Sequence, residues 1–98
     1  MPLVRVSNGG SPSFTPVYYN FSAQSITVPA GSTRLLAIAS RNGTFSIRNV
    51  TNATYTQQEK YRDQTLSIIL TIDVTDSAQP VQISASSAYT VFNVLDIS

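Results

Sequence analysis

Apolar and polar residues alternate along short stretches of this chain, and that period of two is typical of β-strands with one buried face. The clearest case is the stretch 66–74, where every second residue is Leu, Ile or Val and most of the residues between are polar. Ile69 interrupts the polar side and is a candidate for burial against a partner. No stretch shows a helical period with an apolar face.

Other segments give weaker strand signals. The stretch 34–40 is almost continuously apolar, which predicts a strand covered on both faces. The pair Asn42-Gly43 follows it and predicts a tight hairpin that returns over 44–48. We expect 54–57 to be a polar strand, either at a sheet edge or with a solvated face. We expect 57–64 to be a loop because Tyr61 is its only apolar residue. Further strands are expected at 3–6, 17–21, 25–28, 81–84 and 89–95.

This pattern predicts an all-β fold of about eight or nine short strands in one antiparallel β-sandwich, either jelly-roll or Ig-like. Ninety-eight residues is the size of one domain, so residues 1–98 are expected to form a single unit. Pro12 and Pro16 exclude a regular central strand from the stretch 1–16. That stretch is either a loop within the sandwich or an extended N-terminal arm that adds residues 3–6 to the sheet of a neighbour.

The chain has no histidine and no cysteine, and its carboxylates are few. These absences exclude disulfides and the usual zinc sites, and they remove the common bases of nucleophilic catalysis. Asp73 and Asp76 are the closest acidic pair at a strand end, and turn capping by Asp76 is the simpler interpretation. We therefore predict no enzyme activity, no catalytic residues, no metal site and no cofactor.

Charge and hydropathy exclude further classes. A net charge of +1 argues against nucleic-acid binding, which needs several cationic contacts to phosphates. The longest apolar run, 35–39, is far too short to span a bilayer. Residues 1–5 show no secretion signal, so a soluble protein without Sec-type export is expected, unless a leader was removed.

The side-chain composition favours binding. Protein interfaces are enriched in Arg and Tyr and depleted in Lys and Glu, and this chain has five Arg and five Tyr against one Lys and one Glu. Arg34, Arg41 and Arg48 lie around the predicted hairpin and form the patch that we expect to bind a partner. The alternative is that the tyrosines Tyr18, Tyr55 and Tyr89 pack in the core. The candidate interface residues are Arg5, Arg34, Arg41, Arg48, Tyr18, Tyr19 and Tyr55.

In style the whole chain resembles the small β-sandwich proteins with which tailed bacteriophages decorate their capsids. The resemblance lies in the size, the missing Cys and His, the Ser/Thr-rich strands, and the segments Met1-Pro2-Leu3-Val4-Arg5-Val6, Val28-Pro29-Ala30-Gly31-Ser32 and Arg34-Leu35-Leu36. It implies a non-catalytic virion protein that stabilises a shell of capsid protein by bridging capsomers as a small homo-oligomer. The Pro-Ala-Gly turn and the apolar strand after it also resemble Ig-like adhesion modules, which implies binding to carbohydrate or to a cell surface. An enzyme built around Asp73 is the third and weakest alternative.

Overall fold

The computed structural model describes the backbone of residues 15–97 and the side chains of residues 23–97. All regular secondary structure in this part of the chain is β-strand, so the all-β prediction is confirmed. The expected strand at 3–6 and the choice between arm and loop for 1–16 fall largely outside these residues. The eight described strands are β1 (Thr15–Ala23), β2 (Ser25–Val28), β3 (Arg34–Asn42), β4 (Ile47–Val50), β5 (Ala53–Arg62), β6 (Thr65–Val74), β7 (Val81–Ala85) and β8 (Thr90–Asp96).

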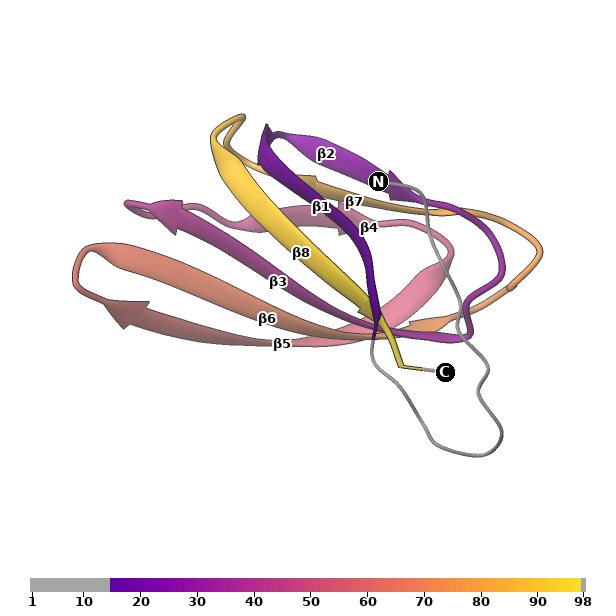
Figure 1. Cartoon of the computed structure of the whole chain (residues 1–98). Coiled ribbons are helices and arrows are strands. Elements are labelled where there is room, and N and C mark those ends of the chain that lie inside the picture. The colour runs from indigo at the N-terminus through magenta and orange to yellow at the C-terminus, as the bar shows by residue number, and fades with distance from the viewer. Residues whose placement is uncertain (1–14, 98) are drawn as a thin grey trace.

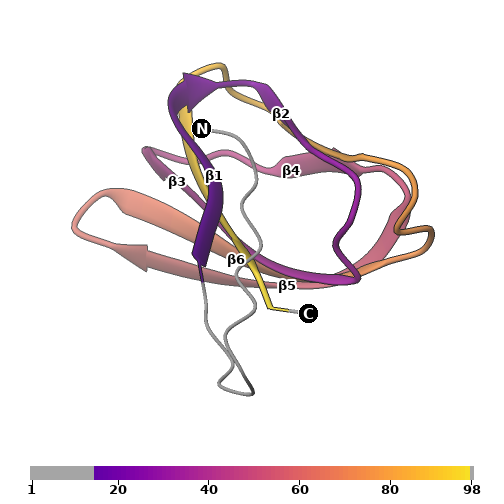
Figure 2. The same cartoon turned by 45° about the vertical axis from the view of Figure 1, so that its right-hand side comes forward.

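The strands form two antiparallel sheets, one with the order β1-β8-β3-β6-β5 and one with the order β2-β7-β4. Their pairing is nested, because β1 pairs with β8, β2 with β7 and β3 with β6. The chain therefore runs out and back like one long hairpin that is folded over on itself (Figure 1). The two sheets lie over each other, and the β5–β6 hairpin extends to one side (Figure 2).

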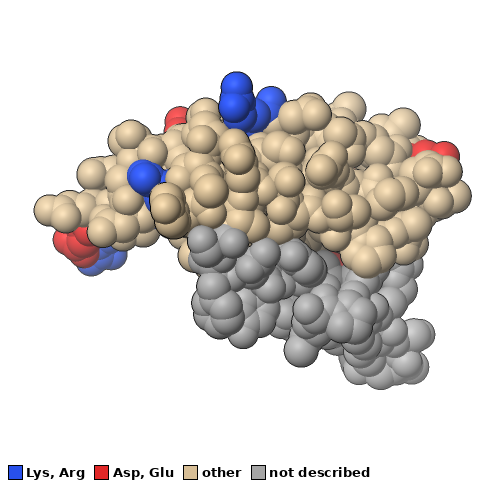
Figure 3. All heavy atoms as spheres, turned by 90° about the horizontal axis from the view of Figure 1, so that it is seen from above, with Lys and Arg blue, Asp and Glu red and all other residues tan. Residues whose placement is uncertain are grey.

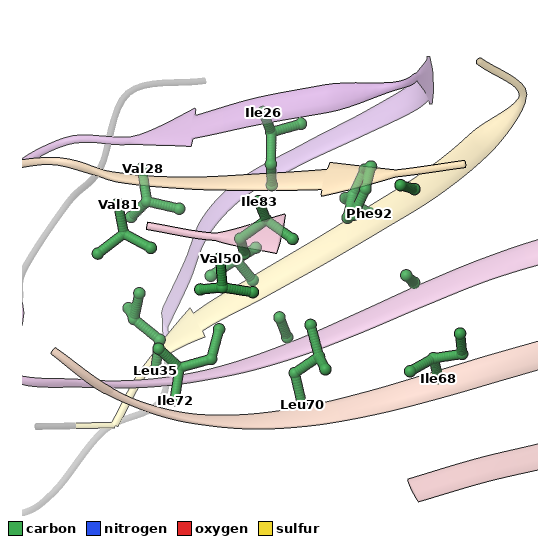
Figure 4. Packing of buried hydrophobic residues seen from close by; sticks show 14 of the residues in the cluster. Ile26, Val28, Leu35, Val50, Ile68, Leu70, Ile72, Val81, Ile83 and Phe92 are labelled. Carbon is green, nitrogen blue, oxygen red and sulfur yellow. The ribbon is translucent and has the colours of Figure 1, made fainter. Parts of the chain in front are cut away.

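One hydrophobic core lies between the two sheets. Phe92, Leu70 and Leu35 come from the larger sheet and are fully buried, and Ile83 and Val28 meet them from the smaller one. Figure 4 shows these side chains pointing from both layers into the same interior. Burial of this apolar surface is the main term that favours folding, since the chain has no disulfide to add to it.

The alternation along 66–74 produces the burial that it predicts. In β6, Leu66, Ile68, Leu70 and Ile72 are buried, and the residues between them are exposed or half-buried. β3 follows the same rule on its inner face, where Leu35, Ala37 and Ala39 are fully buried. Its other face is only half-buried, and no described strand packs over it. The expected cover on both faces is therefore seen on one.

The expected hairpin at Asn42-Gly43 is wrong. β3 pairs with β6 and β8, whereas β4 pairs with β7 in the other sheet. Gly43 has a φ of +109°, and its N–H donates to the carbonyl of Gln64 at 2.8 Å. Gly43 thus lies in the turn where the chain passes from the larger sheet to the smaller one. This turn needs a residue with positive φ, as a tight hairpin does.

The loop expected at 57–64 is also wrong. β5 continues to Arg62 in unbroken register with β6, and only Asp63 and Gln64 form the turn. These two residues have φ values of 52° and 68°, the signature of a two-residue type I′ hairpin. The segment has no apolar face because the smaller sheet does not cover it.

Candidate interaction surface

β5 forms one edge of the larger sheet and is exposed on both faces. From Thr54 to Arg62 every side chain is exposed. The even-numbered residues share the outer face of the sheet with Thr71 and Asp73 of β6. The odd-numbered residues lie opposite the buried positions of β6 and so share the core side, but they extend past the smaller sheet.

Two tyrosines stand on this uncovered inner side. Tyr55 is 38% exposed and Tyr61 is 58% exposed. They lie opposite Ile72 and Leu66, which are themselves buried. Core packing is therefore excluded for Tyr55, and its role in an interface stays a prediction. Sequence reasoning missed Tyr61 because its segment was interpreted as a loop, although its even spacing from Tyr55 places both on one face of any strand.

The backbone of β5 also has a free edge. The N–H of Thr75 donates to the carbonyl of Asn52 at 2.8 Å, which makes 52–75 a hydrogen-bonded pair of the β5–β6 ladder. Such pairs alternate along an antiparallel ladder. The even-numbered residues of β5 therefore bond to β6, and the N–H and C=O groups of Tyr55, Gln57, Glu59 and Tyr61 point away from it. No described strand pairs with this side of β5.

The other described sheet edges are less suited to pairing. β2 and β4 have four residues each, and the register of β4 shifts around Arg48. β1 contains Pro16, and its register with β8 shifts twice. Short strands, prolines and bulges are the usual devices that protect sheet edges from pairing. β5 is ten residues long, contains no proline and no register shift, and has charged side chains only near one end, at Glu59, Lys60 and Arg62.

The structure does not bring the predicted arginines together. Arg34 and Arg41 lie at opposite ends of β3, and Arg48 is exposed on β4 in the other sheet, at its register shift. The expected cluster around one hairpin is therefore wrong, because that hairpin does not exist. Arg5 lies outside the described residues. Tyr18 and Tyr19 are described only by their backbone, which pairs with Val94 and Asn93 of β8.

Arg41 holds two loops to the end of β3. Its Nε donates to Ser87 Oγ at 2.8 Å, and its Nη1 donates to the carbonyls of Asn42 at 3.2 Å and Thr44 at 3.1 Å. These bonds engage the guanidinium within the chain. Arg34 forms an ion pair with Asp73 directly across the β3–β6 ladder, at 2.9 Å from Nε to Oδ1.

The carboxylates are dispersed in the structure. Asp76 Oδ1 accepts the N–H of Ala78 at 3.0 Å, so the expected turn-capping role of Asp76 is confirmed. Asp96 is buried, and Ser32 Oγ donates to its Oδ2 at 3.2 Å. Within residues 15–97, no three acidic side chains lie close enough together to hold a metal ion. That same part of the chain contains no helix that could cross a membrane.

No protein-family model, curated protein or solved structure matches this chain.

Proposed function

We propose that this protein is a non-catalytic assembly protein that binds protein surfaces, as a capsid decoration protein or another virion component that stabilises a shell. One observation carries the proposal: from Thr54 to Arg62, β5 presents nine residues of regular strand with both faces and one backbone edge exposed. A strand held in this way by a folded sheet keeps its contact groups in fixed positions, and such pre-organisation lowers the entropic cost of binding.

The chemistry of β5 supports a contact role. Tyrosine gives a large contact area with only two rotatable side-chain bonds, and the hydroxyl and amide groups of its Thr and Gln neighbours can hydrogen-bond to a protein partner. Figure 3 shows one face of the molecule with few, scattered charges and uncharged residues between them. A surface of this kind favours contact over the strong charge repulsion that keeps monomers apart.

The strand order supports a jelly-roll sandwich over an Ig-like one. We propose the jelly roll because the first and last described strands pair, followed inward by β2 with β7 and β3 with β6, which is the arrangement obtained by rolling one long antiparallel ribbon. Jelly rolls occur in viral capsid proteins and also in lectins and cupins. The fold therefore agrees with a virion role, by analogy of fold alone.

The proposal is tested first by the gene neighbourhood and then by binding. Genes for a capsid protein, a portal or a prohead protease should adjoin the gene of this chain. Shells assembled from that capsid protein should sediment with the wild-type protein saturably. Replacement of Tyr55 and Tyr61 by Ser should weaken this binding about tenfold. The matched control is Tyr89→Ser, since Tyr89 is 73% exposed and lies outside β5.

A strictly monomeric protein that stays in the supernatant with such shells would contradict the assembly role. Saturable binding of a monomer to glycans, lost in the Tyr55 and Tyr61 variant, would instead favour the carbohydrate-binding adhesion module.

A further inference from the structure

We propose that the free edge of β5 pairs with the same edge of a second copy of this chain, antiparallel and about a two-fold axis at Gln58. The two five-stranded sheets would then form one continuous sheet across the dimer. The inference rests on the proposed function, because an oligomeric assembly protein needs a contact between its copies. It adds which surface makes that contact and in which register.

The backbone supplies the main attraction. Tyr55, Gln57, Glu59 and Tyr61 direct their N–H and C=O groups away from β6, as the 2.8 Å bond between Thr75 and Asn52 fixes. An antiparallel edge is complementary to itself, since each donor meets an acceptor when the strand is turned by 180°. Addition of a strand to such an edge is an established mode of protein recognition.

Side-chain charge selects the register. A two-fold axis normal to the sheet places one residue opposite its own copy. An axis at Glu59 or Lys60 sets two like charges face to face, which is destabilising. An axis at Gln57 draws Ala53 into the ladder, where the turn from β4 adjoins it. An axis at Gln58 avoids both problems.

The register at Gln58 also pairs the remaining side chains favourably. Tyr55 lies opposite Tyr61 of the second copy, and this aromatic pair occurs twice. Lys60 faces Thr56 of the second copy, and Glu59 faces its Gln57, so each charge meets a neutral group that can hydrogen-bond. The two Glu59 carboxylates lie diagonally across the axis and repel each other weakly. A single strand pair buries little area, so the fraction of protein in the dimer should fall on dilution.

Cysteine cross-linking tests the register, because the natural chain has no cysteine. Gln58→Cys places two thiols at a non-hydrogen-bonded pair, where facing Cα atoms are about 4.5 Å apart and within reach of a disulfide. This variant should form a disulfide-linked dimer under mild oxidation. Thr56→Cys lies on the same exposed face but opposite Lys60, and it should stay unlinked. Equal linking of both variants, or of neither, would overturn the register.

Sedimentation equilibrium over a dilution series tests the edge itself. Gln57→Pro removes one outward N–H and leaves the β5–β6 ladder intact, so dimerisation should weaken at least about tenfold while the melting temperature is kept. Gln57→Ala keeps that N–H and should dimerise like the wild type. Glu59→Gln removes the repulsion across the axis and should tighten the dimer. The Cys variants and Glu59→Gln test the proposal even if the proline variant does not fold.

The outcomes separate this inference from the proposed function. An oligomer that persists unchanged in folded Gln57→Pro would overturn the β5 contact and leave the assembly role standing. A second result would also overturn the β5 contact between copies: a protein that is monomeric in solution and whose β5 amides become protected from hydrogen exchange only when it is bound to shells. In that case a strand of another protein occupies the edge. A monomer that binds no shell contradicts both.

Discussion

Asn52 binds the backbone of Asp76 from both ends of its side-chain amide. Its Nδ2 donates to the carbonyl of Asp76 at 2.8 Å, and its Oδ1 accepts the N–H of Asp76 at 3.0 Å. The same Nδ2 lies 3.2 Å from the carbonyl of Gln79. Asn52 itself has a φ of 59°, which asparagine tolerates better than most residues. One side chain thus ties the turn before β5 to the loop after β6.

Two substitutions at Asn52 should separate the stability contributed by its side-chain amide from the stability contributed by its backbone conformation. Asn52→Gly keeps the positive φ and loses the amide bonds, and we expect a loss of about 1–3 kcal/mol in the free energy of unfolding. Asn52→Ala adds the left-handed penalty of about 1 kcal/mol. Urea denaturation measures both values. A glycine variant as stable as the wild type would show that the amide bonds contribute nothing net.

Gly43 and Gly31 form a matched pair for testing the corner after β3. Both have positive φ, +109° and +120°, which residues with a side chain rarely adopt, so replacement by Ala should cost each about 1–3 kcal/mol. Only at Gly43 would the new Cβ meet another group, the Arg41 Nη1 at 2.6 Å. The guanidinium must then move from the carbonyls that it binds, so Gly43→Ala should cost about 1 kcal/mol more than Gly31→Ala.

The Arg41→Ala background checks this explanation by urea denaturation. Without the guanidinium, the difference between the two glycine substitutions should disappear. If the difference remains in this background, the extra cost of Gly43→Ala comes from the backbone at Gly43 and not from the guanidinium.

Leu70 and Ile69 are neighbours on opposite faces of β6. Leu70 is fully buried in the core, whereas Ile69 is half-buried on the outer face. Leu70→Ala should lower the free energy of unfolding by about 2–5 kcal/mol, and Ile69→Ala by about 1 kcal/mol. Thermal and urea unfolding give the two values. An equal loss at Ile69 would mean that the outer face of the larger sheet is covered as thoroughly as the core. Cover on both faces of this sheet is what the apolar run of β3 predicts.

The ion pair between Arg34 and Asp73 should add little stability. Both side chains are more than half exposed, at 54% and 58%. A double-mutant cycle with Arg34→Ala and Asp73→Ala should give a coupling energy of about 0.2–1 kcal/mol that falls as salt is added. A larger, salt-independent coupling would show that the pair is shielded from solvent and would favour an interface there.

Local patterns predicted most of the strands because a strand records its environment in alternate residues. Leu66, Ile68 and Leu70 each face the core, so the period of two in β6 was sufficient to assign it. The pattern predicts the bounds of β2, β7 and β8 to within one residue for the same reason. Asp76 was predicted as a turn residue because its capping bond is local.

The candidate site was less predictable, because exposure depends on which sheet lies opposite. Gln57 to Arg62 lack an apolar face, and a pattern cannot distinguish a loop from a strand that nothing covers. Only the size of the smaller sheet decides that β5 extends past it. The free edge, and with it Tyr61, therefore became visible only in the folded chain.

The sequence by itself determined an all-β chain without histidine or cysteine, with a buried face on each core strand. Tertiary structure alone decided which strands are neighbours. The same Asn42-Gly43 that favours a hairpin turns a corner between two sheets, because β6 and β8 occupy both edges of β3. In that position the inner face of β3 is fully buried at Leu35, Ala37 and Ala39, and no local pattern specifies which distant strands lie beside it.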